Sequence, residues 1–307
     1  MKVLFVSAEG SDGQPRNVVK NQGESLKKEG VEVHYFCMRG RGIRGYLKSV
    51  PQLRQEFRKI NPDLVHAHYS LSGIVASLAR VGPLVVSLMG SDANMGPLQN
   101  TITRYFVKSR WQRTIVKSAD MKVRLRINKA EVVPNGVDTE LFTPLDIQSS
   151  AKRVGFDSSC FNILFVSDPA RPEKNFRLAQ KAISFIGNEK IILHPVHEVV
   201  NSEMPFYYCG SNLLLLTSIW EGSPNSVKEA MSCNLPVVAT RVGDVEQLLD
   251  GVEGCHIISF NAHEVAEDIK TVLQSGERAN GRDKIFSLGL DSKTVAKKIT
   301  AIYYQMI

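Results

Sequence analysis

One stretch, residues 213–243, constrains the fold more than any other part of the chain. It begins with the apolar run Leu213 to Leu216, which is too short for a helix and suits a strand buried on both faces. A turn follows, and a helix is predicted from about Pro224 to Ser232, with Ser223 as its capping side chain. Because Leu235 to Thr240 is a second apolar strand, the stretch predicts a strand, loop, helix, strand unit with a right-handed crossover.

The loop before this helix is where chemistry is expected. A glycine lets a ligand approach the backbone, and free N–H groups at a helix start favour an anion. The residues at this position are Gly222, Ser223, Asn225 and Ser226. Two carboxylates, Glu221 and Glu229, frame the loop with seven residues between them, and they suit the hydroxyls of a ribose or a sugar ring. On these residues alone, a helix cap at Glu221 and a solvated charge at Glu229 are an equal alternative.

The same residues carry a resemblance to a known family. Residues 221–231 read EGSPNSVKEAM, and residues 234–243 read NLPVVATRVG. This run closely resembles the E-x7-E donor-site signature of the retaining GT-B glycosyltransferases of the "glycosyl transferases group 1" family. The resemblance implies an α/β fold of GT-B type, in which two Rossmann-like domains with parallel sheets face each other across a cleft. It also implies that Glu229 holds the ribose hydroxyls of a nucleotide-sugar donor and that Glu221 holds the transferred sugar.

The length of 307 residues is enough for two domains with cores of their own. We expect an acceptor-side domain over residues 1–145 and a donor-binding domain over 146–291, with the polar segment 145–161 as the linker. The resemblance implies that a last amphipathic helix, 292–307, packs back on the first domain. The five cysteines are scattered and odd in number, which favours reduced thiols and a cytoplasmic location. No apolar run approaches the ~18 residues of a membrane span.

Charge is distributed unevenly along the chain. Residues 1–145 hold 22 Lys and Arg against 12 Asp and Glu, a net of +10, whereas residues 146–307 hold 16 against 19, a net of −3. A basic amphipathic helix is predicted over residues 100–117; it could lie on an anionic lipid surface or pack its apolar residues in a core. The basic half indicates an acceptor that is anionic or held at a membrane, such as a lipid-linked saccharide. Nucleic acid is not expected, because no recognition module occurs.

The first half begins as a strand, helix, strand unit over residues 2–37, with a G-x-x-G loop at Gly10 and Gly13. A plain tight turn and a ligand cradle are both open for this loop; in the resembling family it lies on the acceptor side, as does Gly90. His66 and His68 share one face of a strand, but a metal site would lack a third ligand nearby. Polar lining of the cleft and buried, hydrogen-bonded histidines are the other interpretations.

The family usually carries a histidine just before the glycine that is Gly90 here, near the sugar and the acceptor. This chain has Met89, which cannot donate to a sugar hydroxyl or exchange a proton. Asp92 and His68 are therefore the candidate catalytic substitutes in the first half.

In the second half, a loop over residues 168–175 follows the strand predicted at Asn162 to Ser167. Its cations, Arg171 and Lys174, are placed to neutralise a diphosphate, although surface charges are the alternative. The family carries Gly-Arg directly after this strand, whereas this chain has Ser167 and Asp168, so Lys174 is the firmer candidate. No D-x-D motif occurs, which favours a site that needs no metal and no other cofactor beyond the nucleotide sugar.

These observations predict a retaining, metal-independent glycosyltransferase. It would move a sugar from a nucleotide-diphosphate sugar to a saccharide or lipid-linked acceptor in the assembly of a cell-surface polysaccharide or glycan. A peripheral contact with the inner face of an anionic membrane, through the basic first domain, is part of this prediction. Two alternatives stay open: a nucleotide-sugar epimerase of the same fold, and a non-catalytic subunit that binds the donor.

Overall fold

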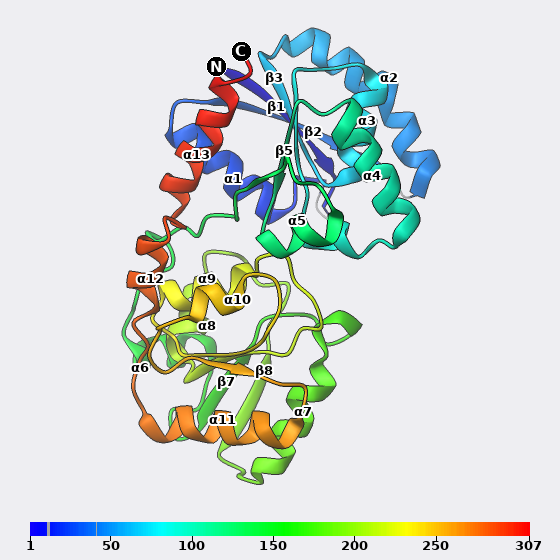
Figure 1. Ribbon diagram of the computed structural model, residues 1–307. Coiled ribbons are helices and arrows are strands. Elements are labelled where there is room, and N and C mark those ends of the chain that lie inside the picture. Colours follow the sequence, from blue (N-terminus) through cyan, green and yellow to red (C-terminus); the bar gives the residue numbers. More distant parts are fainter. Residues whose placement is uncertain (11–12, 41) are drawn as a thin grey trace. The chain divides into compact units, whose positions relative to one another are not determined.

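The computed structural model describes residues 1–10, 13–40 and 42–307, leaving aside the side chains of residues 42–44, and divides the chain into two compact units (Figure 1). The first unit comprises Met1–Gly136 and Ser292–Ile307, and the second comprises Val137–Asp291. The boundary lies before the expected position at 145, because the residues that follow Gly136 pack on the second unit. Val137 and Phe142 are buried in its core, and the Val137 N–H donates to the Leu290 carbonyl at 2.9 Å.

The first unit contains a parallel sheet with the strand order β2-β1-β3-β4-β5-β6 in the described part of the chain. The strands are β1 (Lys2–Ala8), β2 (Glu32–Met38), β3 (Leu64–His68), β4 (Leu84–Ser87), β5 (Arg113–Val116) and β6 (Glu131–Val132). The helices are α1 (Asn17–Lys28), α2 (Gly42–Ile60), α3 (Ser70–Ala79), α4 (Pro97–Ser109), α5 (Ala119–Leu125) and α13 (Ser292–Tyr304), with a 3-10 turn, η1 (Gly90–Asn94). The predicted strand, helix, strand unit is β1, α1 and β2, with β1 and β2 paired in parallel.

Two helical layers cover the two faces of this sheet. One face of β1 and its neighbours packs against α2 and α3, and the other packs against α1 and α13 (Figure 1). α13 is the helix expected over 292–307, and it packs against α1 through Val295, Ile299 and Tyr303. The N- and C-terminal segments therefore belong to one core.

The helix predicted over residues 100–117 is wrong in its second part. α4 ends at Ser109, where the N–H groups of Arg110 and Trp111 both donate to the Phe106 carbonyl, and β5 follows. Thr114, Ile115 and Val116 are β-branched and buried, and β5 pairs with β4 on one side and β6 on the other. β-branched residues suit a buried strand better than a helix, and here they outweigh the helical spacing.

The second unit contains a parallel sheet with the order β11-β10-β9-β7-β8 among its described residues. The strands are β7 (Phe161–Phe165), β8 (Ile191–Pro195), β9 (Leu213–Leu216), β10 (Val237–Thr240) and β11 (His256–Ile258). The helices are α6 (Ile147–Val154), α7 (Phe176–Ile186), α8 (Met204–Gly210), α9 (Asn225–Ser232), α10 (Val245–Leu249), α11 (Ala262–Ser275) and α12 (Gly281–Ser287), with a 3-10 turn, η2 (Pro172–Lys174). The stretch over 213–243 forms the predicted unit as β9, α9 and β10, and β9 and β10 pair in parallel.

The linker predicted over residues 145–161 is only partly a linker, because α6 occupies its centre. The Asp146 carboxylate accepts from the Ser149 N–H at 2.8 Å and caps the helix start, and Gly155 ends the helix with a φ of +75°. α6 packs against α8. The side-chain cap and the C-terminal glycine thus define α6, although the apolar residues of this segment show only weak helical periodicity.

None of the described helices is long and apolar enough to cross a membrane. Both sheets are parallel and of Rossmann-like type. The fold class predicted from the sequence, α/β with two such units, is confirmed.

Candidate functional site

The strand order of the second unit marks where a ligand is expected. From β7 the chain first builds β8 on one side and then crosses to β9 on the other side. In an open α/β sheet, ligands bind at such a switch point, outside the carboxyl ends of the strands. The two loops that meet there are residues 166–175, after β7, and residues 217–224, after β9.

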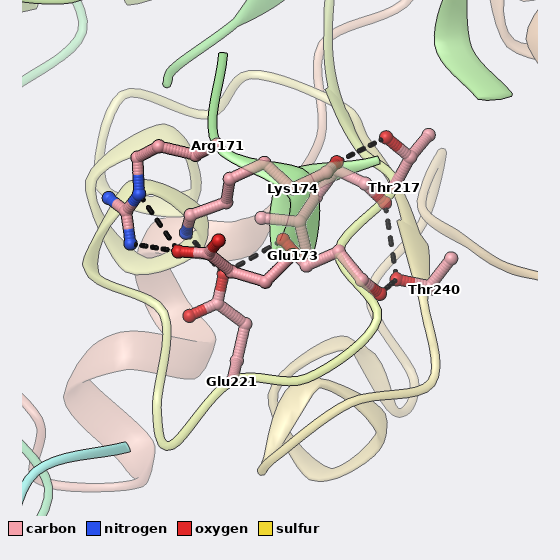
Figure 2. Close-up of polar contacts among 8 residues, drawn as sticks. Arg171, Glu173, Lys174, Thr217, Glu221 and Thr240 are labelled. Atoms are coloured by element: carbon pink, nitrogen blue, oxygen red, sulfur yellow. Dashed lines mark hydrogen bonds and ion pairs between the residues drawn. The ribbon is translucent and has the colours of Figure 1, made fainter. Parts of the chain in front are cut away.

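These two loops bring Lys174 and Glu221 together, as Figure 2 shows. The Lys174 ammonium lies 2.5 Å from Glu221 Oε1, and the side chains are 15% and 14% exposed. The Ser218 hydroxyl donates to the same carboxylate oxygen at 2.8 Å. A largely buried ion pair of this kind fixes both groups at the switch point and keeps them in reach of a ligand.

Backbone and hydroxyl contacts tie the two loops to each other. Thr217 Oγ1 donates to the Lys174 carbonyl at 2.9 Å (Figure 2). The Ile219 N–H donates to the Glu173 carbonyl at 2.8 Å. Thr240, at the end of β10, donates to the Ser218 carbonyl at 2.7 Å. The ion pair therefore rests on a fixed frame built by three adjacent strands.

The start of α9 lies directly after the second loop. Pro224 is its N-cap, and within the described ranges no side chain caps the helix, so the cap predicted for Ser223 is wrong. The Asn225 Oδ1 atom is buried and has no hydrogen-bond partner in the part of the chain that the structure describes. The first N–H groups of a helix have no partner inside it, so those of Asn225 and Ser226 could bind an anion.

A close contact between two glycines fixes the loop at its base. Gly243 has a φ of +59°, and a Cβ atom there would lie 2.6 Å from the Gly222 carbonyl oxygen. Only glycine satisfies both conditions. Gly222 is thus buried against the β10–α10 turn, and the predicted glycine loop depends on a second glycine beyond it.

Glu229 projects from α9 and is half-buried. Tyr208, on α8, is fully buried and donates its hydroxyl to Glu229 Oε2 at 2.7 Å. The loss of solvent raises the pKa of Glu229, while the Tyr208 hydroxyl and the Lys228 ammonium act in the opposite direction. One carboxylate oxygen is thus held by the protein, and a half-buried carboxylate of this type can accept from a pair of ligand hydroxyls.

Sequence reasoning missed a polar cluster beneath the loop. Lys228 is completely buried on α9, and its ammonium donates to Ser223 Oγ at 3.0 Å. The Ser223 hydroxyl in turn hydrogen-bonds the Asp244 carboxyl, whose pKa is raised by burial and lowered by Lys228. Burial lowers the pKa of Lys228 to about 8, and the Asp244 and Glu229 carboxylates oppose that change.

Lys228 lies within the motif at residues 221–231, but the resemblance gives it no role of its own, and Tyr208 lies outside that motif. Lys228 lies between the buried Val227 and Met231 on the apolar face of its helix, and that position was the only signal. Asp244 is separated from Lys228 by a strand, so the sequence could not pair them.

Arg171, the second predicted cation, lies on the rim of the site. Its guanidinium is 2.5 Å from Glu173 Oε1, and its side chain is half-exposed (Figure 2). It is engaged by its own loop rather than by the ion pair of Lys174 and Glu221.

In the first unit, the two catalytic candidates have clear structural surroundings. Asp92 is buried and accepts from the N–H groups of Ser70 at 3.0 Å and Met89 at 2.7 Å, which ties η1 to the start of α3. His68 is buried between the rings of Phe5 and His66, with centroids 4.6 and 4.4 Å away. Burial holds the pKa of His68 well below its usual value, so the ring is neutral. Asp92 is engaged by backbone N–H groups, whereas neither ring nitrogen of His68 has a hydrogen-bond partner among the described residues. Their catalytic role stays a prediction, and the function proposed below does not use them.

The companion histidine, His66, is buried and hydrogen-bonded, as one of the sequence interpretations expected. Its Nδ1 atom is 2.5 Å from the Tyr303 hydroxyl and its Nε2 atom is 2.8 Å from Ser87 Oγ. Among the described residues, no three histidine, cysteine or carboxylate side chains lie close enough together to hold a metal ion.

The three predicted acceptor-side glycines follow strands of the first sheet. Gly10 comes after β1, and its N–H donates to the Gln14 carbonyl at 2.7 Å; Gly13 closes this turn with a φ of +78°. Residues 11 and 12 of the G-x-x-G loop lie outside the described residues. Gly90 follows β4 and begins η1. Because both strands are parallel, these glycines lie at one edge of the sheet.

Two protein families match the chain, one in each unit. Residues 161–275 match the family "Glycosyl transferases group 1", and residues 15–141 match "Glycosyltransferase Family 4". The first match contains Lys174, Glu221 and Glu229, and the second contains most of the first sheet.

The chain is also similar to individual proteins of known name. It is 26% identical over 241 residues to TuaC of Bacillus subtilis (strain 168), a glycosyltransferase named for teichuronic acid biosynthesis; the match covers 69% of this chain and 61% of TuaC. It is 24% identical over 299 residues to the UDP-Gal:alpha-D-GlcNAc-diphosphoundecaprenol alpha-1,3-galactosyltransferase of Escherichia coli, covering 82% and 74% of the two chains. Among solved structures, Anabaena Alr3699/HepE in complex with UDP-glucose has the same fold, with a TM-score of 0.79, 18% identity and full coverage of both chains.

Proposed function

We propose that the chain, which glycosyltransferase families match in both units, is a retaining, metal-independent GT-B glycosyltransferase. It transfers a sugar from a nucleotide-diphosphate sugar to a saccharide or lipid-linked acceptor. The observation that carries the proposal is the Lys174–Glu221 ion pair at the switch point of the second sheet, beside a helix start that no described side chain caps. The cation and the helix N–H groups suit a phosphate, and the carboxylate suits the hydroxyls of a sugar, so the site suits a ligand that carries both.

The donor roles follow from this geometry. The diphosphate lies on the N–H groups of Asn225 and Ser226 and draws the Lys174 ammonium towards it. Glu221 then loses its cationic partner and gains the sugar hydroxyls in its place. Glu229, already oriented by Tyr208, accepts from the ribose hydroxyls.

In the proposed mechanism, retention needs no base from the protein. The bond between the anomeric carbon and the phosphate oxygen breaks, and the acceptor oxygen forms its bond on the same face. The leaving phosphate takes the acceptor's proton, so neither Met89 nor Asp92 has to exchange one. Lys174 and the helix N–H groups stabilise the negative charge that develops on the leaving group, which is the part a metal would otherwise play.

Two observations support a class of acceptor: the positive charge of the first unit and the name of one relative. The Escherichia coli protein is named for a diphosphoundecaprenol acceptor. Residues 1–145 of this chain carry a net charge of +10, from 22 basic and 12 acidic residues. We therefore propose a lipid-linked or anionic saccharide acceptor, met at the cytoplasmic face of a membrane during polysaccharide assembly.

A thermal-shift screen with UDP, GDP, ADP and their sugars, with and without EDTA, tests the donor site first. A nucleotide that binds only the folded protein raises its melting temperature. We expect one base to give a shift that EDTA does not remove. A shift that disappears with EDTA would contradict the metal-independent site, and no shift with any nucleotide would contradict the donor site.

Kinetics with that donor separate the two carboxylates. Glu229→Ala should raise the donor KM, because the ribose contact is made in the ground state as well as the transition state. Glu221→Ala should lower kcat. Product analysis without acceptor gives a second check, since an altered nucleotide sugar would indicate an epimerase instead.

A further inference from the structure

One face of α4 presents apolar side chains to solvent. Leu98, Ile102 and Tyr105, at helical spacings of four and three residues, are 76%, 37% and 60% exposed. The neighbouring face packs Phe106 and Val107 against the core of the first unit. α4 therefore has an apolar face that its own core already uses and a second apolar stripe that the core does not cover.

Cations border this stripe. Arg104 and Lys108 lie on the same helix, one turn apart, beside Tyr105. From residue 97 to residue 130 the chain holds nine basic residues and one acidic residue, Asp120. Lys117 is buried, and the other eight basic residues are Arg104, Lys108, Arg110, Arg113, Lys122, Arg124, Arg126 and Lys129. Exposed apolar side chains with cations alongside match the two regions of an anionic lipid bilayer, the acyl boundary and the charged headgroups.

We propose that the face of α4 formed by Leu98, Ile102 and Tyr105 docks on an anionic lipid bilayer. The helix lies in the interface, with the apolar stripe in the acyl boundary and Lys108 and Arg110 on the headgroups. Tyrosine suits this depth, because its ring is apolar and its hydroxyl is polar. The proposal assigns a surface to the membrane contact proposed above, and it is tested without any sugar transfer, so its failure leaves the donor site untouched.

Sedimentation of the full chain with sucrose-loaded vesicles tests the surface. We expect it to sediment with phosphatidylglycerol vesicles at low ionic strength, and to sediment less with phosphatidylcholine vesicles or at high salt. Leu98→Asp should lower the bound fraction, whereas Ile147→Asp, at an exposed apolar residue of the second unit, should not. Lys108→Glu with Arg110→Glu should weaken binding roughly tenfold or more.

The matched charge control is Lys181→Glu with Lys190→Glu, two exposed lysines of the second unit that change the net charge equally. Retained binding in this control, with loss in the α4 variants, supports the docking surface. Equal loss in both charge pairs would mean general attraction to the protein's net charge and would overturn it. Absence of binding at low salt, or a wild-type dimer that Leu98→Asp dissociates, would overturn it too, the latter in favour of a second copy as the occupant.

Discussion

Lys174 and Arg171 lie on one loop and carry the same charge, yet they meet different surroundings. Lys174 is enclosed with Glu221, whereas Arg171 is half-exposed and paired with Glu173 beside it. Exposed ion pairs contribute little, because water competes for both partners. A charge in an enclosed site acts on a ligand through a lower dielectric, so its removal costs more.

Replacing each cation with a neutral residue should separate their roles. Lys174→Met should lower kcat/KM for the donor by about 100-fold, because it removes a charge-assisted contact to the leaving diphosphate. Arg171→Met, the matched control on the same loop, should cost less than about fivefold. Steady-state kinetics at saturating acceptor measure both. A larger effect at Arg171 than at Lys174 would reverse the assignment.

The buried Lys228 gives a prediction on stability. Burial lowers its pKa from 10.5 to about 8, so the folded protein binds fewer protons than the unfolded chain between these values. Lys228 should therefore contribute a rise in the free energy of unfolding with pH from about 8 to about 10.5, as it loses its charge. Burial raises the pKa of Tyr208, Tyr303 and Cys255, and these groups act in the opposite direction, so the rise is measured as the difference between the wild type and Lys228→Met. In denaturant unfolding across this range, the stability of Lys228→Met should rise less, or fall more, than that of the wild type. The exposed-site control, Lys190→Met, should follow the wild type, and equal slopes for Lys228→Met and the wild type would show that another group titrates.

At the scale of elements, the site depends on how β9, α9 and β10 meet. The turn after β10 passes so close to the loop after β9 that Gly243 contacts the Gly222 backbone. The position of the α9 start, and with it the direction of its free N–H groups, is set by this contact.

Gly243→Ala should disturb the loop, and Gly251→Ala supplies the control. Both glycines have positive φ, +59° and +70°, but only Gly243 has backbone atoms where the Cβ would lie. Gly251→Ala should cost about 1 kcal/mol from the backbone conformation alone. Gly243→Ala should cost more and should also abolish the nucleotide-induced thermal shift. If both variants keep the thermal shift, nucleotide binding by the loop after β9 does not depend on the close contact between Gly243 and the Gly222 backbone.

The sequence predicted these elements unequally well. Leu213 to Thr240 was predicted closely, because a buried parallel strand is a continuous apolar run and the helix between has clear boundaries. Residues 113–116 were predicted as helix, because apolar spacing alone does not tell a short buried strand from a helix. α6 was missed, since its definition comes from the Asp146 cap and Gly155 rather than from periodicity.

The candidate site was predictable where residues are close in the sequence. Glu221, Gly222 and Glu229 belong to one motif. Tyr208 and Asp244 reach the same site from α8 and from the turn after β10, and no spacing rule connects them to the motif. Tertiary packing alone brings such residues together, so the residues that orient Glu229 and Ser223 came only from the structure.

At the scale of the whole molecule, the chain leaves the first unit at Gly136 and returns to it at Ser292. α13 then completes the layer beside α1, and Tyr303 joins His66 through its hydroxyl. The stability of the first unit thus depends on the last residues of the chain. The two loops proposed to bind the donor, residues 166–175 and 217–224, belong entirely to the second unit.

Tyr303→Ala should therefore separate the stabilities of the two units. Tyr303 is fully buried, and its truncation leaves a cavity and an unpaired His66, at a cost of about 3–5 kcal/mol. Hydrogen exchange should accelerate in β1, β3 and α1, while nucleotide still protects the loops after β7 and β9. Its neighbour Tyr304 is 63% exposed, so Tyr304→Ala should change neither region. Loss of nucleotide protection in Tyr303→Ala would instead show that the donor site needs an intact first unit.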